Sequence, residues 1–140
     1  MAELIRDNFI PVKNHVKENP AAFERFGAQW TPTVIVADPQ GTERYRFEGY
    51  LPADEFMAQL QLGLAKTAFA QNDFAKAEQL YRDIVRRFPN SAAAPEALYW
   101  AGVSKYKATN DAAALKETGA AFRSQYSDSQ WAKKASVWAA

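Results

Sequence analysis

The stretch Trp30-Thr31-Pro32-Thr33-Val34-Ile35-Val36-Ala37 decides the fold of the first part of the chain. Its second half, residues 33–37, is an uninterrupted apolar run rich in β-branched side chains, which predicts a buried β-strand. Asp38-Pro39-Gln40-Gly41 follows and is typical of a tight turn, because proline presets φ and glycine accepts a positive φ. Residues 42–47 then alternate between charged and aromatic side chains, so the sequence predicts that they return as the second strand of a hairpin.

Two further elements are predicted before this hairpin. Residues 9–16 have the pattern of a strand, with Pro11 restricting its pairing on one side. Residues 20–26 are predicted to form a short helix, since Pro20 suits the first turn and Gly27 suits the end. With the helix expected after residue 52, the order is β-α-β-β-α, and the first part belongs to the α/β class.

From Pro52 onward the sequence predicts only helices. The second of them has a strongly periodic apolar face over residues 74–88, with Asp73 as a plausible N-cap and Pro89 at its end. Later helices are predicted to open at Ser91, after the break at residues 110–111, and at Ser129. No linker separates the two parts. We therefore expect two domains, residues 1–62 and 63–140, that share a continuous helix.

Composition argues against most kinds of catalysis. The 140 residues contain no cysteine and one histidine, His15, which removes thiol chemistry and most histidine-based metal and triad arrangements. The net charge of +1 gives no electrostatic footprint for nucleic acid or a membrane surface. The sequence shows neither a membrane-spanning apolar run nor a signal peptide. We expect a cytoplasmic protein with no cofactor, no metal and no catalytic residue.

The helical part repeats itself with an offset of 38 residues. This offset aligns Phe88 with Tyr126 and Trp100 with Trp138. The first unit has small, aromatic, turn and proline residues at Ala65, Phe69, Asp73, Phe74, Ala77, Tyr81 and Pro89. In these positions the sequence resembles the tetratricopeptide repeat family. The second unit matches through Gly102, Tyr106 and Ala114 but departs at Thr118 and Ser127, where an aromatic residue and proline are usual.

The first part resembles the thioredoxin family over about residues 3–62. The motifs that carry the resemblance are residues 14–20, Phe26-Gly27, residues 30–36, Gly41, residues 45–47 and Gly49. Thr31-Pro32-Thr33 matches the family's cis-proline segment, so the resemblance implies a cis Thr31–Pro32 bond and a substrate-binding loop at Trp30, Thr31 and Pro32. The family's Cys-x-x-Cys helix and central strand have no counterpart, and residues 3–8 look like the tail of that helix.

The missing central strand leaves backbone groups unpaired on the two predicted strands at residues 9–16 and 33–37. Three remedies exist: the two strands pair directly, a second copy completes the sheet, or the native polypeptide is longer. A symmetric homodimer is the commonest oligomeric solution. We therefore expect a homodimer that completes the sheet.

Several side chains are candidates for binding. In the helical part, Trp100, Tyr106, Arg82 and Arg86 could contact a protein or peptide. The competing interpretation makes the aromatics part of the core and the arginines part of a solvated face. With only about two repeats, docking on the α/β part or oligomerisation is favoured over peptide capture. His15, beside Glu18, is interpreted as a surface residue rather than a base.

Three functional hypotheses remain. The favoured one is a non-catalytic protein-interaction or assembly module. The alternative is the C-terminal part of a thioredoxin-family thiol-disulfide oxidoreductase whose catalytic cysteines lie in a missing N-terminal segment. A third is a cysteine-free thioredoxin-like chaperone that binds unfolded clients.

Overall fold

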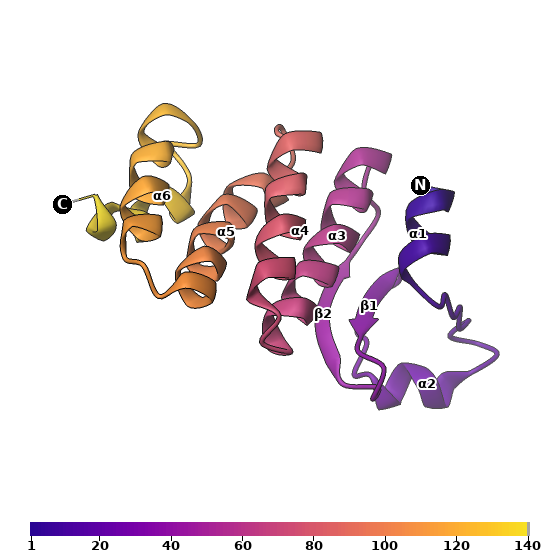
Figure 1. Ribbon diagram of the computed structural model, residues 1–140. Coiled ribbons are helices and arrows are strands. Elements are labelled where there is room, and N and C mark those ends of the chain that lie inside the picture. Colours follow the sequence, from indigo (N-terminus) through magenta and orange to yellow (C-terminus); the bar gives the residue numbers. More distant parts are fainter. Residues whose placement is uncertain (140) are drawn as a thin grey trace.

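A computed structural model describes residues 1–139 and shows a small α/β part at one end of a row of stacked helices (Figure 1). The elements are α1 (Ala2–Asn8), α2 (Pro20–Arg25), β1 (Thr33–Ala37), β2 (Glu43–Glu48), α3 (Ala53–Ala70), α4 (Phe74–Arg87), α5 (Ala93–Thr109), α6 (Ala113–Ser124), α7 (Gln130–Ala135) and a 3-10 helix, η1 (Ser136–Trp138). The predicted fold class, an α/β start followed by helical hairpins, is confirmed.

The hairpin of β1 and β2 forms as predicted. The strands are antiparallel, with Val34 opposite Phe47 and Val36 opposite Tyr45. The turn between them is fixed by Asp38, whose carboxylate accepts hydrogen bonds from the backbone N–H groups of Gln40 and Thr42 at 3.0 and 2.9 Å. The expectation that the whole of β1 is buried is wrong. Only Val36 is buried, because side-chain burial depends on what covers the faces of the sheet, and Val36 is the residue that packs against Gly63 of α3.

The strand predicted at residues 9–16 is also wrong. This segment is irregular, and its apolar side chains face solvent: Ile10 is 94% exposed and Val12 is 78% exposed. A strand is stable only when its backbone groups are paired. Within residues 1–139, β1 pairs with β2 alone, and no third strand is present to pair with this segment. The observed order of the first part is therefore α-α-β-β-α.

Helix α3 connects the two parts of the chain. It runs without a break across residues 62 and 63, which confirms the predicted continuous helix. Gly63 lies directly under β1, where a Cβ atom would stand 2.6 Å from Cγ2 of Val36. The absence of a side chain at Gly63 therefore lets the sheet rest closely on α3.

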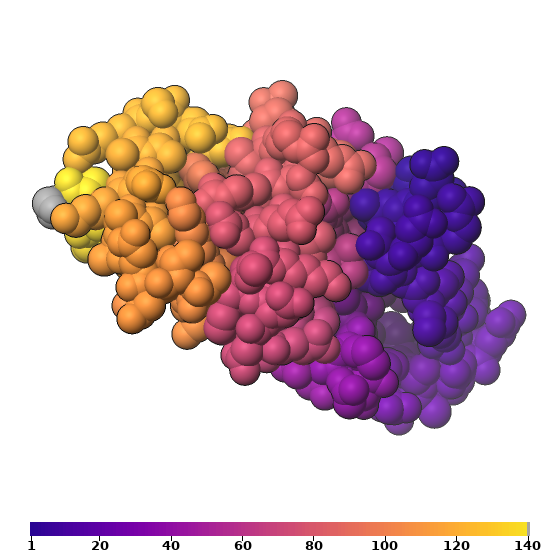
Figure 2. Space-filling view, viewed as in Figure 1, coloured from indigo at the N-terminus to yellow at the C-terminus, as the bar shows by residue number. Residues whose placement is uncertain are grey.

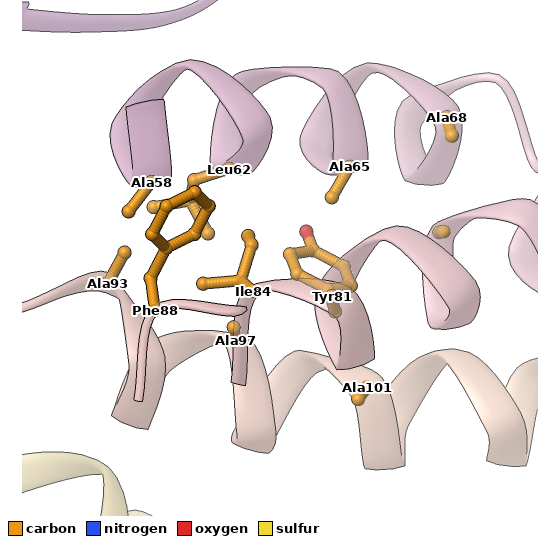
Figure 3. Close-up of a cluster of buried hydrophobic side chains, with 11 residues drawn as sticks. Ala58, Leu62, Ala65, Ala68, Tyr81, Ile84, Phe88, Ala93, Ala97 and Ala101 are labelled. Atoms are coloured by element: carbon orange, nitrogen blue, oxygen red, sulfur yellow. The ribbon is translucent and has the colours of Figure 1, made fainter. Parts of the chain in front are cut away.

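The main core lies between α3, α4 and α5 (Figure 3). Three large side chains, those of Tyr81 and Ile84 on α4 and that of Phe88 directly after it, point between the two flanking helices. The surfaces that receive them are built mostly of alanine: Ala58, Ala65 and Ala68 on α3, and Ala93, Ala97 and Ala101 on α5. Small residues let the helices approach, and the aromatic rings fill the remaining space.

The ends of the helices show the repeat in the backbone. Asn72 and Asn110, 38 residues apart, both adopt positive φ, at 62° and 57°. Asp73 caps α4 as predicted, accepting a hydrogen bond from the N–H of Lys76 at 3.3 Å. The prediction that Ser91 opens the third helix is off by two residues, since α5 begins at Ala93 and the Ser91 hydroxyl donates to the Phe88 carbonyl instead.

Candidate docking surfaces

The loop before β1 contains the predicted binding residues Trp30, Thr31 and Pro32. The Thr31–Pro32 peptide bond is cis, which agrees with the expectation drawn from the thioredoxin resemblance. Trp30 is 64% exposed, and its carbonyl accepts a hydrogen bond from the Thr33 hydroxyl at 2.6 Å. The Pro32 carbonyl accepts a hydrogen bond from the N–H of Gly49 at 2.9 Å. The loop is thus tied to the hairpin at the end of the sheet while its largest side chain faces solvent.

The edge of β1 that faces away from β2 is open. The bond from Gly49 to Pro32 and the strand register together show that Pro32, Val34 and Val36 turn their backbone groups toward β2. The backbone groups of Thr33 and Ile35 therefore point to the other side, where residues 1–139 supply no strand. Figure 2 shows an opening between the N-terminal segment and the remainder of the α/β part.

The two edges of the sheet differ in charge. Strand β2 carries Glu43, Arg44, Arg46 and Glu48, whereas β1 carries no charged residue. Charged side chains on an edge strand discourage pairing with another chain. The β1 edge lacks that protection, so it is the edge on which a further strand can add.

A second candidate surface is a pocket where the sheet meets the helical part. It has a volume of about 230 Å³ and is lined by Arg44 of β2, Lys66 and Phe69 of α3, Tyr81 of α4 and Trp100 of α5. The Lys66 ammonium lies over the rings of Tyr45 and Trp100, at 5.3 and 6.0 Å from their centroids. It also lies 3.1 Å from a carboxylate oxygen of Glu96. We call this the junction pocket.

Burial and the charge of Glu96 both raise the pKa of the two tyrosines near the junction pocket, Tyr45 and Tyr81. Burial raises the pKa of the Tyr45 phenol to about 12, and the negative charge of Glu96 adds to that effect. The same two causes raise the pKa of Tyr81. Both phenols are therefore neutral at physiological pH and can serve as hydrogen-bond donors. The Tyr45 hydroxyl already donates to the side-chain oxygen of Gln59.

The structure separates the residues predicted as the binding set of the helical part. Trp100 lines the junction pocket and contacts Phe69 with ring centroids 5.3 Å apart. Arg82 and Arg86 lie on α4, exposed, and pair with Glu78 and Asp83 at 2.8 and 2.7 Å. Neither arginine lines the pocket, and Tyr106 is half-buried farther along α5.

The sequence reasoning missed Arg44, Lys66 and Glu96. They come from three different elements, β2, α3 and α5, and no local pattern in the sequence connects them. His15 is exposed, and its Nδ1 accepts a hydrogen bond from the N–H of Lys17 at 3.2 Å.

Another open pocket, of about 320 Å³, lies where α3 begins and α5 begins. Its carboxylate, Glu55, accepts hydrogen bonds from the N–H of Ala92 at 3.1 and 3.2 Å. Glu55 therefore binds the start of α5 to α3, which is a structural role.

Residues 1–139 contain no group of three His, Cys, Asp or Glu side chains placed to hold a metal ion. None of the helices in this range has the length and apolar character needed to span a bilayer.

Comparison with known families supports the two resemblances. A model of the thioredoxin-like domain matches residues 3–63, and a model of the tetratricopeptide repeat matches residues 58–100. The two matches overlap within α3. Searches of curated proteins and of solved structures found no match. Residues 3–63 are thus similar to the thioredoxin-like domain, and residues 58–100 are similar to the tetratricopeptide repeat.

Proposed function

We propose that the chain is a non-catalytic protein-interaction or assembly module. The observation that carries this proposal is the open, uncharged edge of β1. The exposed Trp30 and Thr31 and the half-buried Pro32 lie at the end of the same edge and extend the surface that a partner strand would contact. Within this proposal, residues 1–62 and 63–140 act as the two domains of a cytoplasmic protein.

The partner that fits the edge best is a second copy of the chain. Because Thr33 and Ile35 point their backbone groups outward, two β1 strands can pair antiparallel about Ile35 and form one four-stranded sheet. No like charges meet in such a pairing, since β1 has none. The charged edges of β2 would then form the two outer borders of the sheet, where charge prevents further addition.

Sedimentation equilibrium over a range of concentrations tests the homodimer. The wild-type chain is expected to give twice the protomer mass. Ile35→Lys and Thr33→Lys place a charge at the open edge and are expected to give the protomer mass, while Glu48→Lys, on the other edge, is the matched control and leaves the dimer intact. A wild-type chain that stays a monomer at every concentration contradicts the proposal.

One observation favours the alternative, the C-terminal part of a thioredoxin-family oxidoreductase. The thioredoxin-like family model matches residues 3–63, and within that match the exposed Trp30 precedes the loop that resembles the family's substrate-binding segment. The intact mass and N-terminal sequence of the native protein, taken from its own cells, decide between the two. A longer polypeptide with a Cys-x-x-Cys segment supports the oxidoreductase. A protein that begins at Met1 excludes dithiol chemistry.

A further inference from the structure

We infer that the junction pocket binds the carboxylate of an acidic side chain on a partner peptide. Two cations converge there from different parts of the fold, Arg44 from the sheet and Lys66 from the helical array. Both reach solvent, with side chains 31% and 26% exposed. A ligand can therefore meet both charges without opening the fold.

Arg44 has hydrogen-bond donors that are available to a ligand. It uses its Nε atom on Asp38 at 2.9 Å, and its two terminal nitrogens make no hydrogen bond within residues 1–139. These nitrogens form the planar fork that binds a carboxylate through two parallel bonds. Asp38 does not compete for them, since it is only 2% exposed and also holds the N–H groups of Gln40 and Thr42.

Lys66 is held in place by aromatic rings and by an ion pair with Glu96. The rings of Tyr45 and Trp100 fix its ammonium, and Glu96 lies 3.1 Å away. The contacting oxygen of Glu96 is buried, yet it makes no hydrogen bond of good geometry. The pocket wall also contains a buried donor without a partner, Nε1 of Trp100. Among residues 1–139, the terminal nitrogens of Arg44 and Nε1 of Trp100 are therefore the donors without a partner at the pocket, and Glu96 is the group with which an incoming carboxylate would compete for Lys66.

Size and surroundings indicate a peptide. A volume of about 230 Å³ is below the range of about 300–1,000 Å³ typical of pockets for whole small molecules, and suits one side chain. Beyond the pocket, Phe69 contacts both Trp100 and Phe74, with ring centroids 5.3 and 5.1 Å apart. Lys107 lies over Phe74 at 5.1 Å. An aromatic row with a lysine near each end therefore offers an acidic peptide a third cation, Lys107, beyond Arg44 and Lys66.

Charge over the whole helical part agrees with this partner. Residues 63–140 contain eleven Lys and Arg against seven Asp and Glu, a net charge of +4, whereas residues 1–62 are net negative. An acidic peptide is therefore attracted to the helical part and guided toward its concentrated charges. The inference adds a partner chemistry to the proposed interaction module, and it does not involve the open edge of β1.

Fluorescence anisotropy with a short labelled peptide rich in glutamate tests the inference, and the same peptide with glutamine in place of glutamate is the neutral probe. The glutamate peptide is expected to bind and the glutamine peptide is not. Arg44→Gln and Lys66→Gln are each expected to weaken binding by about tenfold, because each removes one charge-assisted contact. Lys107→Gln should weaken it less, and Lys66→Arg should preserve it.

Glu96→Gln gives the sharpest outcome, since it is expected to strengthen binding by removing the competing carboxylate. Arg82→Gln is the matched control: it removes the same charge from a cation that also has a carboxylate partner, outside the pocket. It should leave affinity within about twofold. Any one of three results overturns the inference. The first is that both peptides bind equally or that neither binds. The second is that Arg82→Gln and Lys66→Gln lose the same affinity for the glutamate peptide, and the third is that Glu96→Gln binds it more weakly than the wild type. Oligomeric state, measured separately, reports on the β1 edge alone.

Discussion

Gly102 of α5 and Thr118 of α6 lie so close that a Cβ atom at Gly102 would stand 2.0 Å from the Thr118 hydroxyl oxygen. The tetratricopeptide pattern aligns Thr118 with Tyr81 of the first repeat, one residue short of the 38-residue offset, and Tyr81 fills the space between α3 and α5 with its ring. The second repeat has a small residue there, and its hydroxyl donates back to the Ala114 carbonyl at 2.7 Å. The departure from the repeat pattern at Thr118 therefore coincides with a close contact between α5 and α6 at Gly102.

Gly102→Ala is expected to destabilise the protein by about 1–3 kcal/mol, although alanine is the better helix former, because the added methyl group has no room. Chemical denaturation monitored by circular dichroism measures the change. Adding Thr118→Ala removes the hydroxyl and the methyl group that face Gly102, and the double variant should lose less stability than the sum of the two single variants. Strict additivity would contradict the packing argument.

Ile84→Ala is expected to cost about 2–5 kcal/mol. Ile84 is fully buried between α3 and α5, and the rigid alanine-lined surfaces around it cannot collapse into the space left behind. Val137→Ala is a suitable control because Val137 is 72% exposed, and it should change stability by less than about 0.5 kcal/mol. Equal effects of the two substitutions would show that this core is loosely packed.

Asn72→Ala and Asn110→Ala are each expected to lower stability by about 1 kcal/mol, since both positions have positive φ and alanine is strained there. Glycine accepts this backbone conformation, so Asn72→Gly and Asn110→Gly should restore most of the loss. Thermal unfolding of the four variants measures both effects. A glycine variant no more stable than its alanine counterpart would assign the asparagine a side-chain role instead.

Asp38→Asn is expected to lower the melting temperature at neutral pH and to have little effect in acid. The N–H of Thr42 and the guanidinium of Arg44 hold the pKa of Asp38 below its ordinary value, against the opposing effect of burial. The unfolded chain therefore takes up a proton first as the pH falls. The stabilisation from Asp38 is complete above its ordinary pKa of 3.8 and is lost as the pH falls through the lower, folded value. Melting curves of both proteins from pH 7 to pH 2 should therefore converge at the acid end, and a constant difference would contradict this origin.

Local patterns in the sequence predict those elements whose turn and capping residues are close to them in the sequence. The β1–β2 hairpin has its turn residues at 38–41, and α4 has its N-cap at Asp73, so both could be found from neighbouring residues. The segment at residues 9–16 has an equally clear strand pattern, but a strand also needs a neighbour, and nothing in a local pattern says whether one is present. The start of α5 was misplaced for a similar reason, because its capping group, Glu55, comes from α3.

The candidate sites differ in the same way: one is contiguous in the sequence, and the other is assembled by tertiary packing. The loop at Trp30, Thr31 and Pro32 is contiguous and could be singled out from its motif. The junction pocket is assembled from Arg44, Lys66 and Trp100 on three elements, and only Trp100 was singled out. Arg82 and Arg86 share a helix face and were therefore noticed together, yet each is paired with an acidic residue one turn or less away. Arg82 and Arg86 could be found because they are close in the sequence. The residues of the junction pocket are far apart in the sequence and come together only through tertiary packing.

Helix α3 has a consequence for how partners can be arranged. It supports β1 through Gly63, contributes Lys66 to the junction pocket and forms one wall of the main core. Because one continuous helix supplies all three, there is no hinge between the open edge and the pocket. Two partners bound at the β1 edge and at the junction pocket would therefore be held at a fixed distance and angle from each other.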